Sequence, residues 1–203
     1  MAAPTSATRS ANKLSGRDLI NVGIFTAIYF VIMFGFGMLG SLGPFMSGLA
    51  FLLGILANGT VIALYLSRVH KLGSMTLLGL IVSCLMVATG HPWFTILTTT
   101  ALGACADLIA NAGHFAKARL NIVAYAVFCL WYVGPIMPVV WDTAGYRQYV
   151  TDSMNAEYAD GWMRIFSPST LPLWGLAFFA AGLIGGWFGQ SVLRRQFRRA
   201  GVA

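Results

Sequence analysis

The most unusual residue in this sequence is an acid that stands inside an apolar run. Asp107 lies in the stretch ACADLIANAGH, and Asn111 follows four residues later, so both side chains project from one face of a helix. An ionisable group surrounded by hydrocarbon is costly, and it usually pairs with another group or performs a function. Asp107 could bind a cationic ligand, relay a proton or hold helices together through hydrogen bonds. The structural role is favoured, because Asp107 lies nearer the end of its segment that the charge pattern, described below, places in the cytoplasm.

The motif GHPWF places a histidine and a tryptophan in one tight connection. The imidazole of His91 can ligate a metal or hydrogen-bond a ligand, and the indole of Trp93 can stack on a ligand. A turn histidine and an interfacial tryptophan that bind nothing fit the same pattern. Asn58, in LANGTV, poses a related choice at mid-depth in its apolar segment, between a ligand contact and a hydrogen bond to a neighbouring helix.

Aromatic residues collect in the stretch from about 142 to 169. The spacing of Tyr146 and Tyr149 predicts a short helix that lies on the outer surface. One interpretation is an interfacial belt of aromatic side chains, which membrane proteins commonly have. The other is a lid over a ligand, to which Trp141, Tyr146 and Trp162 would contribute.

The sequence contains no recognisable catalytic apparatus. Paired carboxylates, an HExxH motif, a metal-ligand triad and a phosphate-binding P-loop are all missing, and no acid, base and nucleophile combine into a site. We therefore expect a protein that is not an enzyme and has no intrinsic cofactor. The stretch GLIGGWFG lies in an apolar run, where the pairs Gly182/Gly186 and Gly185/Gly189 predict close helix packing.

These candidate residues must be positioned by membrane-spanning helices. Of the 203 residues, 58% are hydrophobic and only 9% are charged, and the mean hydropathy is +0.74, which excludes an ordinary soluble domain. Spanning a bilayer takes about 20 apolar residues in a helix. The sequence therefore predicts an all-α integral membrane protein with six transmembrane helices, at approximately 19–38, 46–67, 73–90, 94–113, 121–141 and 170–193.

The charge distribution predicts the orientation of these helices. Arg147 and Arg164 share one side with four acids, whereas the other basic residues lie before the first helix, after the second and the fourth, and at the end of the chain. Under the positive-inside rule both termini are therefore cytoplasmic. Because the basic residues are dispersed among apolar segments, the net charge of +7 does not indicate nucleic-acid binding. The residues on the cytoplasmic side are Arg9, Lys13, Arg17, Arg68, Lys71, Lys117, Arg119, Arg194, Arg195, Arg198 and Arg199.

The domain boundaries follow from the same pattern. Residues 17–194 are expected to form the six-helix domain, with the long outer loop at 142–169. Residues 1–16, rich in Ala, Ser and Thr, are expected to be a disordered cytoplasmic tail, and residues 195–203 a basic cytoplasmic tail. A cleaved signal peptide is the less favoured alternative for the first segment, because its apolar run is long and further spans follow it.

A smooth face in the first predicted helix also needs an explanation. In NVGIFTAIYFVIMF, Gly23 and Ala27 lie four residues apart, so they share a helical face that another backbone could approach closely. A helix immersed only in lipid gains nothing from small residues at both positions. The sequence therefore predicts a protein contact at Gly23 and Ala27, either within the chain or with another subunit.

The opening stretch KLSGRDLINVGIFTAIYFVIMFGFGMLG, the six-helix layout and the basic end LRRQFRRAG resemble S components of energy-coupling factor (ECF) transporters, in particular the Trep_Strep or MptD-type family. The resemblance covers residues 13–201 and is sharpest in the first helix. It implies a bacterial plasma-membrane protein that captures a small micronutrient outside the cell. Cargo would be delivered through the transmembrane scaffold EcfT and two ATPase subunits. Gly23 and Ala27 would correspond to the Ala-xxx-Ala motif that faces EcfT, with glycine as a departure that keeps the face small.

The resemblance also implies where the cargo binds. In an S component, the loops after the first, third and fifth helices enclose the pocket, and here they map to residues 38–46, 90–93 and 142–169. The substrate-binding candidates are therefore His91, Trp93, Asn58, Trp141, Tyr146 and Trp162.

The cargo and the rival function remain open in the sequence. Haem or another tetrapyrrole would suit an aromatic mouth that holds a histidine, with methionines nearby, and His91 could then ligate the metal. A vitamin-like compound is the other expectation. The rival function is a stand-alone secondary transporter or channel that uses Asp107 as its proton or cation site.

Overall fold

The computed structural model describes residues 14–199, and every regular element within this range is a helix. The predicted all-α fold is therefore confirmed. Helices occupy each of the six predicted segments, the fifth through an α-helix and a 3-10 helix together, and short helices follow it. In chain order the elements are α2 (Gly16–Met38), the 3-10 helix η1 (Leu39–Leu42), α3 (Pro44–Arg68), α4 (Ser74–Ala88), α5 (Thr95–Asn111), α6 (Ala118–Cys129), the 3-10 helix η2 (Leu130–Ile136), α7 (Pro138–Trp141), α8 (Thr143–Ser153), α9 (Ala156–Ile165) and α10 (Leu171–Arg199).

The long helices differ in whether they could cross a membrane. α4 has 15 residues and α5 has 17. At about 1.5 Å per residue they measure roughly 23 and 26 Å, less than the ~30 Å hydrocarbon core. Among the described residues, four segments are long and apolar enough to span: Gly16–Leu42, Pro44–Arg68, Ala118–Ile136 and Leu171–Gln196. The structure thus has four candidate spans, and six crossings stay a prediction.

Two boundaries differ from the predicted ones. The fifth predicted segment changes its winding after Cys129 and continues as η2, which contains Pro135; a proline removes a backbone hydrogen-bond donor, so regular α-helix does not continue there. α10 runs on to Arg199, so the predicted C-terminal tail is helical at its beginning. Residues 1–13 of the predicted N-terminal tail, and residues 200–203, lie outside the described residues.

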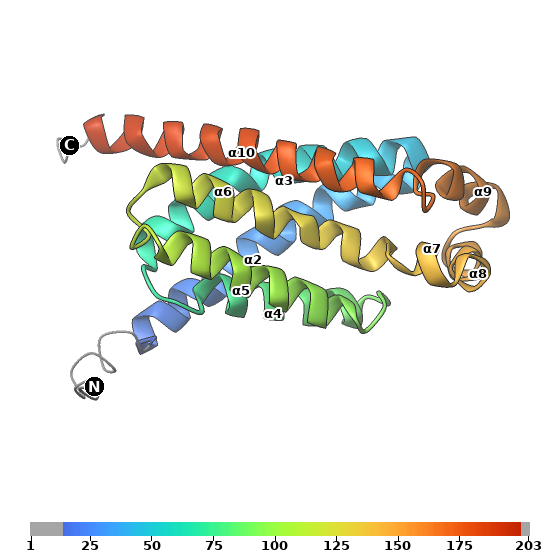
Figure 1. Ribbon diagram of the computed structural model, residues 1–203, viewed down its shortest axis with the longest axis horizontal. Coiled ribbons are helices and arrows are strands. Elements are labelled where there is room, and N and C mark those ends of the chain that lie inside the picture. The colour runs from blue at the N-terminus through green and yellow to red at the C-terminus, as the bar shows by residue number, and fades with distance from the viewer. Residues whose placement is uncertain (1–13, 200–203) are drawn as a thin grey trace, which may run out of the picture.

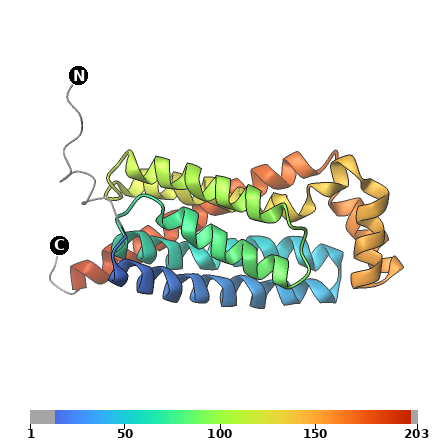
Figure 2. The ribbon, with the colours of Figure 1, turned by 90° about the horizontal axis from the view of Figure 1, so that it is seen from below.

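The long helices run lengthwise between two ends of the molecule (Figure 1, Figure 2). One end, here named the basic end, holds the start of α2, the α3–α4 and α5–α6 connections and the end of α10. The opposite end, here named the cavity end, holds η1, the α4–α5 connection and helices α7 to α9. The described basic residues predicted to be cytoplasmic all belong to the basic end.

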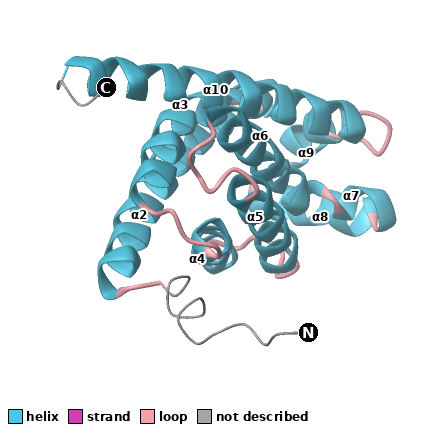
Figure 3. Ribbon diagram, turned by 60° about the vertical axis from the view of Figure 1, so that its left-hand side comes forward, coloured by secondary structure: helices cyan, strands magenta, loops and turns pink. Residues whose placement is uncertain are grey.

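Helix α2 lies at the edge of the bundle, beside α3 and α4 (Figure 3). It begins with a capping box, in which Ser15 and Asp18 exchange backbone-to-side-chain hydrogen bonds. Only a narrow strip of this helix is buried. Of the residues in its most apolar stretch, 22% are buried, against 50% in α3 and 33% in α10. The buried residues of α2 are Val22, Thr26, Tyr29 and Met33.

Helices α3, α6 and α10 pack much more closely, and glycines make this possible. A Cβ built on Gly59 of α3 would lie 2.2 Å from the backbone of Gly185 in α10, and one on Gly189 would lie 2.3 Å from the Gly59 carbonyl oxygen. A Cβ on Gly182 would lie 2.6 Å from the backbone of Ala126 in α6. The predicted close packing of the glycine-rich stretch in α10 is confirmed, because no larger side chain fits at these approaches.

A candidate ligand-binding cavity

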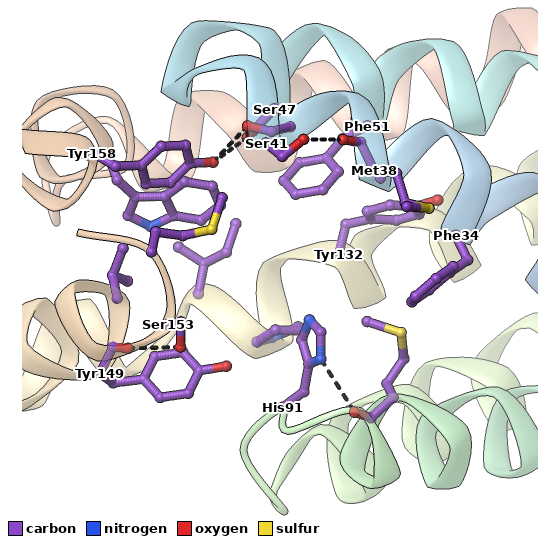
Figure 4. Close-up of a pocket in the computed structure, with 18 of the residues that line it drawn as sticks. Phe34, Met38, Ser41, Ser47, Phe51, His91, Tyr132, Tyr149, Ser153 and Tyr158 are labelled. Atoms are coloured by element: carbon purple, nitrogen blue, oxygen red, sulfur yellow. Dashed lines mark hydrogen bonds between the residues drawn. The ribbon is translucent and has the colours of Figure 1, made fainter.

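A cavity of about 350 Å³ lies at the cavity end of the bundle (Figure 4). Its walls come from the end of α2, η1, the first turns of α3, the α4–α5 connection, η2, and helices α8 and α9. Most lining side chains are aromatic or contain sulfur. The lining includes Met33, Phe34, Met38, Ser41, Ser47, Phe51, Met86, His91, Trp131, Tyr132, Tyr146, Tyr149, Ser153, Met154, Tyr158 and Trp162.

The inner wall of the cavity is built on η2. The tight winding of η2 brings Trp131 and Tyr132 close together, with their ring centroids 4.5 Å apart, and both are buried. Trp131 Nε1 donates a hydrogen bond of 3.0 Å to the hydroxyl of Tyr29 in α2, while Tyr132 packs on Phe51 of α3 at 5.6 Å. Buried indole and phenol groups normally find such partners, and these contacts fix the wall in position.

Helices α7, α8 and α9 (residues 138–165), here named the lid, form one unit, of which α8 and α9 line the cavity. They enclose a second apolar cluster built around Val139, Val150 and Phe166. Arg147 of α8 and Asp160 of α9 join the two helices by an ion pair of 2.6 Å on the exposed surface. The predicted surface helix is therefore present and forms part of a folded cover.

Two tyrosines fasten the lid to opposite sides of the cavity. In α9, the hydroxyl of Tyr158 donates to the Gly40 carbonyl at 2.9 Å and lies 2.7 Å from Ser47 Oγ. In α8, the hydroxyl of Tyr149 donates to the Gly90 carbonyl at 3.1 Å. Burial raises the pKa of each tyrosine above the ordinary tyrosine value. Interactions with Ser153 for Tyr149 and with Ser47 for Tyr158 partly offset this rise. Both therefore keep their protons and act as donors at neutral pH.

His91 presents one ring nitrogen to the cavity. Its Nδ1 lies 3.1 Å from the Met86 carbonyl oxygen at the end of α4. A carbonyl can only accept a hydrogen bond, so Nδ1 carries the proton and Nε2 is left as an acceptor. Burial lowers the pKa of His91, and the bond to Met86 only partly offsets this, so the ring is neutral at pH 7. In Figure 4 the other nitrogen, Nε2, points away from Met86 and into the cavity.

The structure brings three of the predicted binding residues together and leaves three elsewhere. His91, Tyr146 and Trp162 line the cavity. Trp93 and Trp141 do not line it; they are 69% and 60% exposed on the outside of this end, where the ring of Phe94 lies between them.

Asn58 does not reach the cavity either. It is buried in α3 and donates from Nδ2 to the Tyr29 carbonyl of α2 at 3.3 Å. This is the interhelical hydrogen bond that the sequence offered as the alternative to a ligand contact.

Asp107 caps the start of α4 from the neighbouring helix α5. Its carboxylate accepts from the backbone amides of Met75 at 3.0 Å and Thr76 at 2.8 Å, and from the Thr76 hydroxyl at 2.6 Å. Gly73, the N-cap residue just before the helix, supplies no side-chain cap, so Asp107 satisfies amides that would otherwise have no acceptor. Asn111 is exposed and takes no part in this arrangement.

Several lining residues were not among the predicted ones, notably Met33, Phe51, Met86 and Tyr132. They stand in apolar runs in which a residue that lines a cavity and a residue in the core have the same composition. Among residues 14–199, no group of three or more His, Cys, Asp or Glu side chains is arranged to hold a metal, so a metal at His91 would have to find its other ligands elsewhere.

The long apolar helices define an integral membrane protein, and the cavity end of its bundle holds a half-open pocket lined mostly by aromatic and sulfur-containing side chains. The chain belongs to a family described as hypothetical bacterial integral membrane protein (Trep_Strep), which it matches over residues 16–199. No curated protein and no solved structure matches the chain.

Proposed function

We propose that the chain is the substrate-binding S component of an ECF importer in the bacterial plasma membrane. The observation that carries this proposal is the open face of α2 around Gly23 and Ala27. Both residues are exposed, and a Cβ built on Gly23 would lie more than 4 Å from every other described helix. Because no helix within residues 14–199 packs on this small-residue face, we take it to be available to the scaffold EcfT.

The cavity supplies the second half of the proposal. It lies at the end of the bundle away from the basic clusters, which the positive-inside rule assigns to the cytoplasm. Six crossings would then put both termini inside the cell and the cavity outside, with the short helices α4 and α5 spanning a locally thinned bilayer. A small micronutrient held under the lid would be released inward when EcfT and two ATPase subunits act on α2.

The cargo is expected to be small. His91 and several methionines line the cavity. These are the side-chain types that could contact a tetrapyrrole and its metal. A cavity of about 350 Å³ lies at the small end of the roughly 300–1,000 Å³ that pockets for small molecules have, so we expect a vitamin-like compound rather than a four-ring macrocycle.

A stand-alone carrier that uses Asp107 gains no support from the geometry. The carboxylate is buried and its acceptor positions are occupied by donors of α4. It does not line the cavity, so no route joins it to a bound ligand there.

The proposal is tested by assembly. The chain is co-expressed with EcfT and the two ATPases, and the amount of EcfT that co-purifies is measured for the wild type and for the double variant Gly23→Leu/Ala27→Leu. We expect the double variant to fold but to lose most of its EcfT. Ala180→Leu, an exposed small residue of α10, is the matched control and should retain EcfT. Normal assembly of the double variant would refute the role of this face.

A further inference from the structure

The chemistry of the cavity lining restricts the charge of its ligand. Among the described residues that line it there is no Asp, Glu, Lys or Arg, and His91 is neutral at pH 7. The cavity is half open, and a charged group held in its interior, under the lid, without a partner is strongly unfavourable. A carboxylate, a phosphate or an ammonium group would have no counter-charge here.

The hydroxyl groups of the lining are already committed to the protein. Ser41 donates to the Met38 carbonyl and Ser153 to the Tyr149 carbonyl, each at 2.8 Å. Tyr149 and Tyr158 hold the lid, as described above. Each of these hydroxyls already donates its proton to a backbone carbonyl, so it can offer a ligand only acceptor lone pairs.

The two remaining phenols, of Tyr132 and Tyr146, lie near the Tyr29 hydroxyl and Trp162 Nε1 respectively, and Trp162 Nε1 makes no hydrogen bond within residues 14–199. A neutral imidazole nitrogen is a stronger acceptor than a hydroxyl oxygen, so the strongest acceptor that this lining offers a ligand is Nε2 of His91.

The rest of the lining offers flat apolar surface. Tyr132, Phe34 and Trp162 reach the cavity from three different elements, and Phe34 and Tyr132 lie across the cavity from His91 (Figure 4). Aromatic faces in this arrangement favour stacked or edge-on contact with another ring. Pockets of this kind combine many apolar contacts with a few polar groups that fix orientation.

We infer that the cavity binds an uncharged compound of one or two rings that donates a hydrogen bond to Nε2 of His91. This inference rests on the proposed function in one respect, namely that the bound compound would be the cargo of the importer. Binding requires the chain alone, whereas coupling requires EcfT, so the two can fail separately.

The experiment compares three probes of the same shape and different charge. The purified chain in detergent is titrated at pH 7.5 by calorimetry with 2-naphthamide, which is neutral and carries an N–H donor, with the anion 2-naphthoate and with the cation 2-naphthamidine. We expect the amide to bind about tenfold more tightly than either ion. His91→Phe should weaken amide binding about tenfold.

Trp93→Phe is the matched control, because Trp93 stands in the same connection but outside the cavity; it should leave amide binding unchanged. Melting temperatures establish that each variant is folded, and the comparison of probes on the wild type does not depend on any variant. The inference is overturned if the amide does not bind, if either ion binds within threefold of it, or if folded His91→Phe binds it within threefold of the wild type.

Discussion

The glycine face of α10 and the small face of α2 have the same four-residue spacing but opposite surroundings. Gly185 and Gly189 are buried against α3, at distances where a Cβ would meet backbone atoms within about 3 Å. Gly23 and Ala27 are exposed on α2, where the neighbouring residue Ile24 is also 51% exposed. Small residues thus allow a close approach to both helices, and among the described residues a helix of the same chain occupies this approach on α10 but not on α2.

This difference separates stability from assembly. A larger side chain on the glycine face of α10 would clash with a helix of the same chain, so it should lower the stability of the fold. On α2 a larger residue meets lipid or a partner, so the fold should tolerate it and only association should change. The following changes test this contrast, from the largest expected effect to the smallest.

Gly59→Leu should be the most damaging substitution. Its Cβ alone would overlap the backbone of Gly185, so α3 and α10 would have to separate, at a cost of about 3 kcal/mol or more. Gel filtration and thermal melting should show loss of the monodisperse folded species. Gly23→Leu is the control and should keep the wild-type melting temperature; equal damage from both variants would contradict the contrast.

Asp107→Ala should destabilise the fold by about 1–3 kcal/mol, because it leaves the amides of Met75 and Thr76 without their acceptor. The free energy of unfolding in denaturant measures the effect. Asn111→Ala, on the exposed side of the same helix, should change it by less than about 0.5 kcal/mol. Unchanged stability of Asp107→Ala, together with altered proton-driven flux, would favour the carrier instead.

Tyr158→Phe should loosen the lid at a cost of about 1 kcal/mol, since it removes the donor to the Gly40 carbonyl. Hydrogen exchange of the α9 amides should accelerate, while exchange in α3 and α10 stays at the wild-type rate. Acceleration spread evenly over all helices would show that the bond supports the whole fold rather than the lid.

Lowering the pH should weaken 2-naphthamide binding through His91. The pKa of His91 lies below its ordinary value of 6.5 because the ring is buried, so binding should be constant above pH 7 and fall only when the folded protein takes up the proton. The unfolded chain takes up this proton first, so the contribution of the neutral ring to stability is complete above pH 6.5 and declines below it. The residual binding of 2-naphthamide to His91→Phe, measured at higher probe concentrations, should show no such pH dependence. An identical pH profile in both proteins would show that His91 does not bind the probe.

Some of these features could be predicted from the sequence and others could not. The close packing of α10 and the placing of His91, Tyr146 and Trp162 at one end follow from local spacing and from position relative to the charges. Tyr132 could not be singled out, because its exposure to the cavity depends on the tight winding of η2. Two of the four donors that bind Asp107 are backbone amides, which leave no signature in a sequence.

The contact between α2 and EcfT is the central claim, and site-specific photo-cross-linking tests it most directly. Benzoylphenylalanine is placed at Val31, on the same face of α2 as Ala27, or at Leu176 of α10; these residues are 68% and 67% exposed. In the assembled complex, EcfT should be captured from position 31 and not from position 176. Capture from position 176 alone, or equal capture from both, would contradict the account.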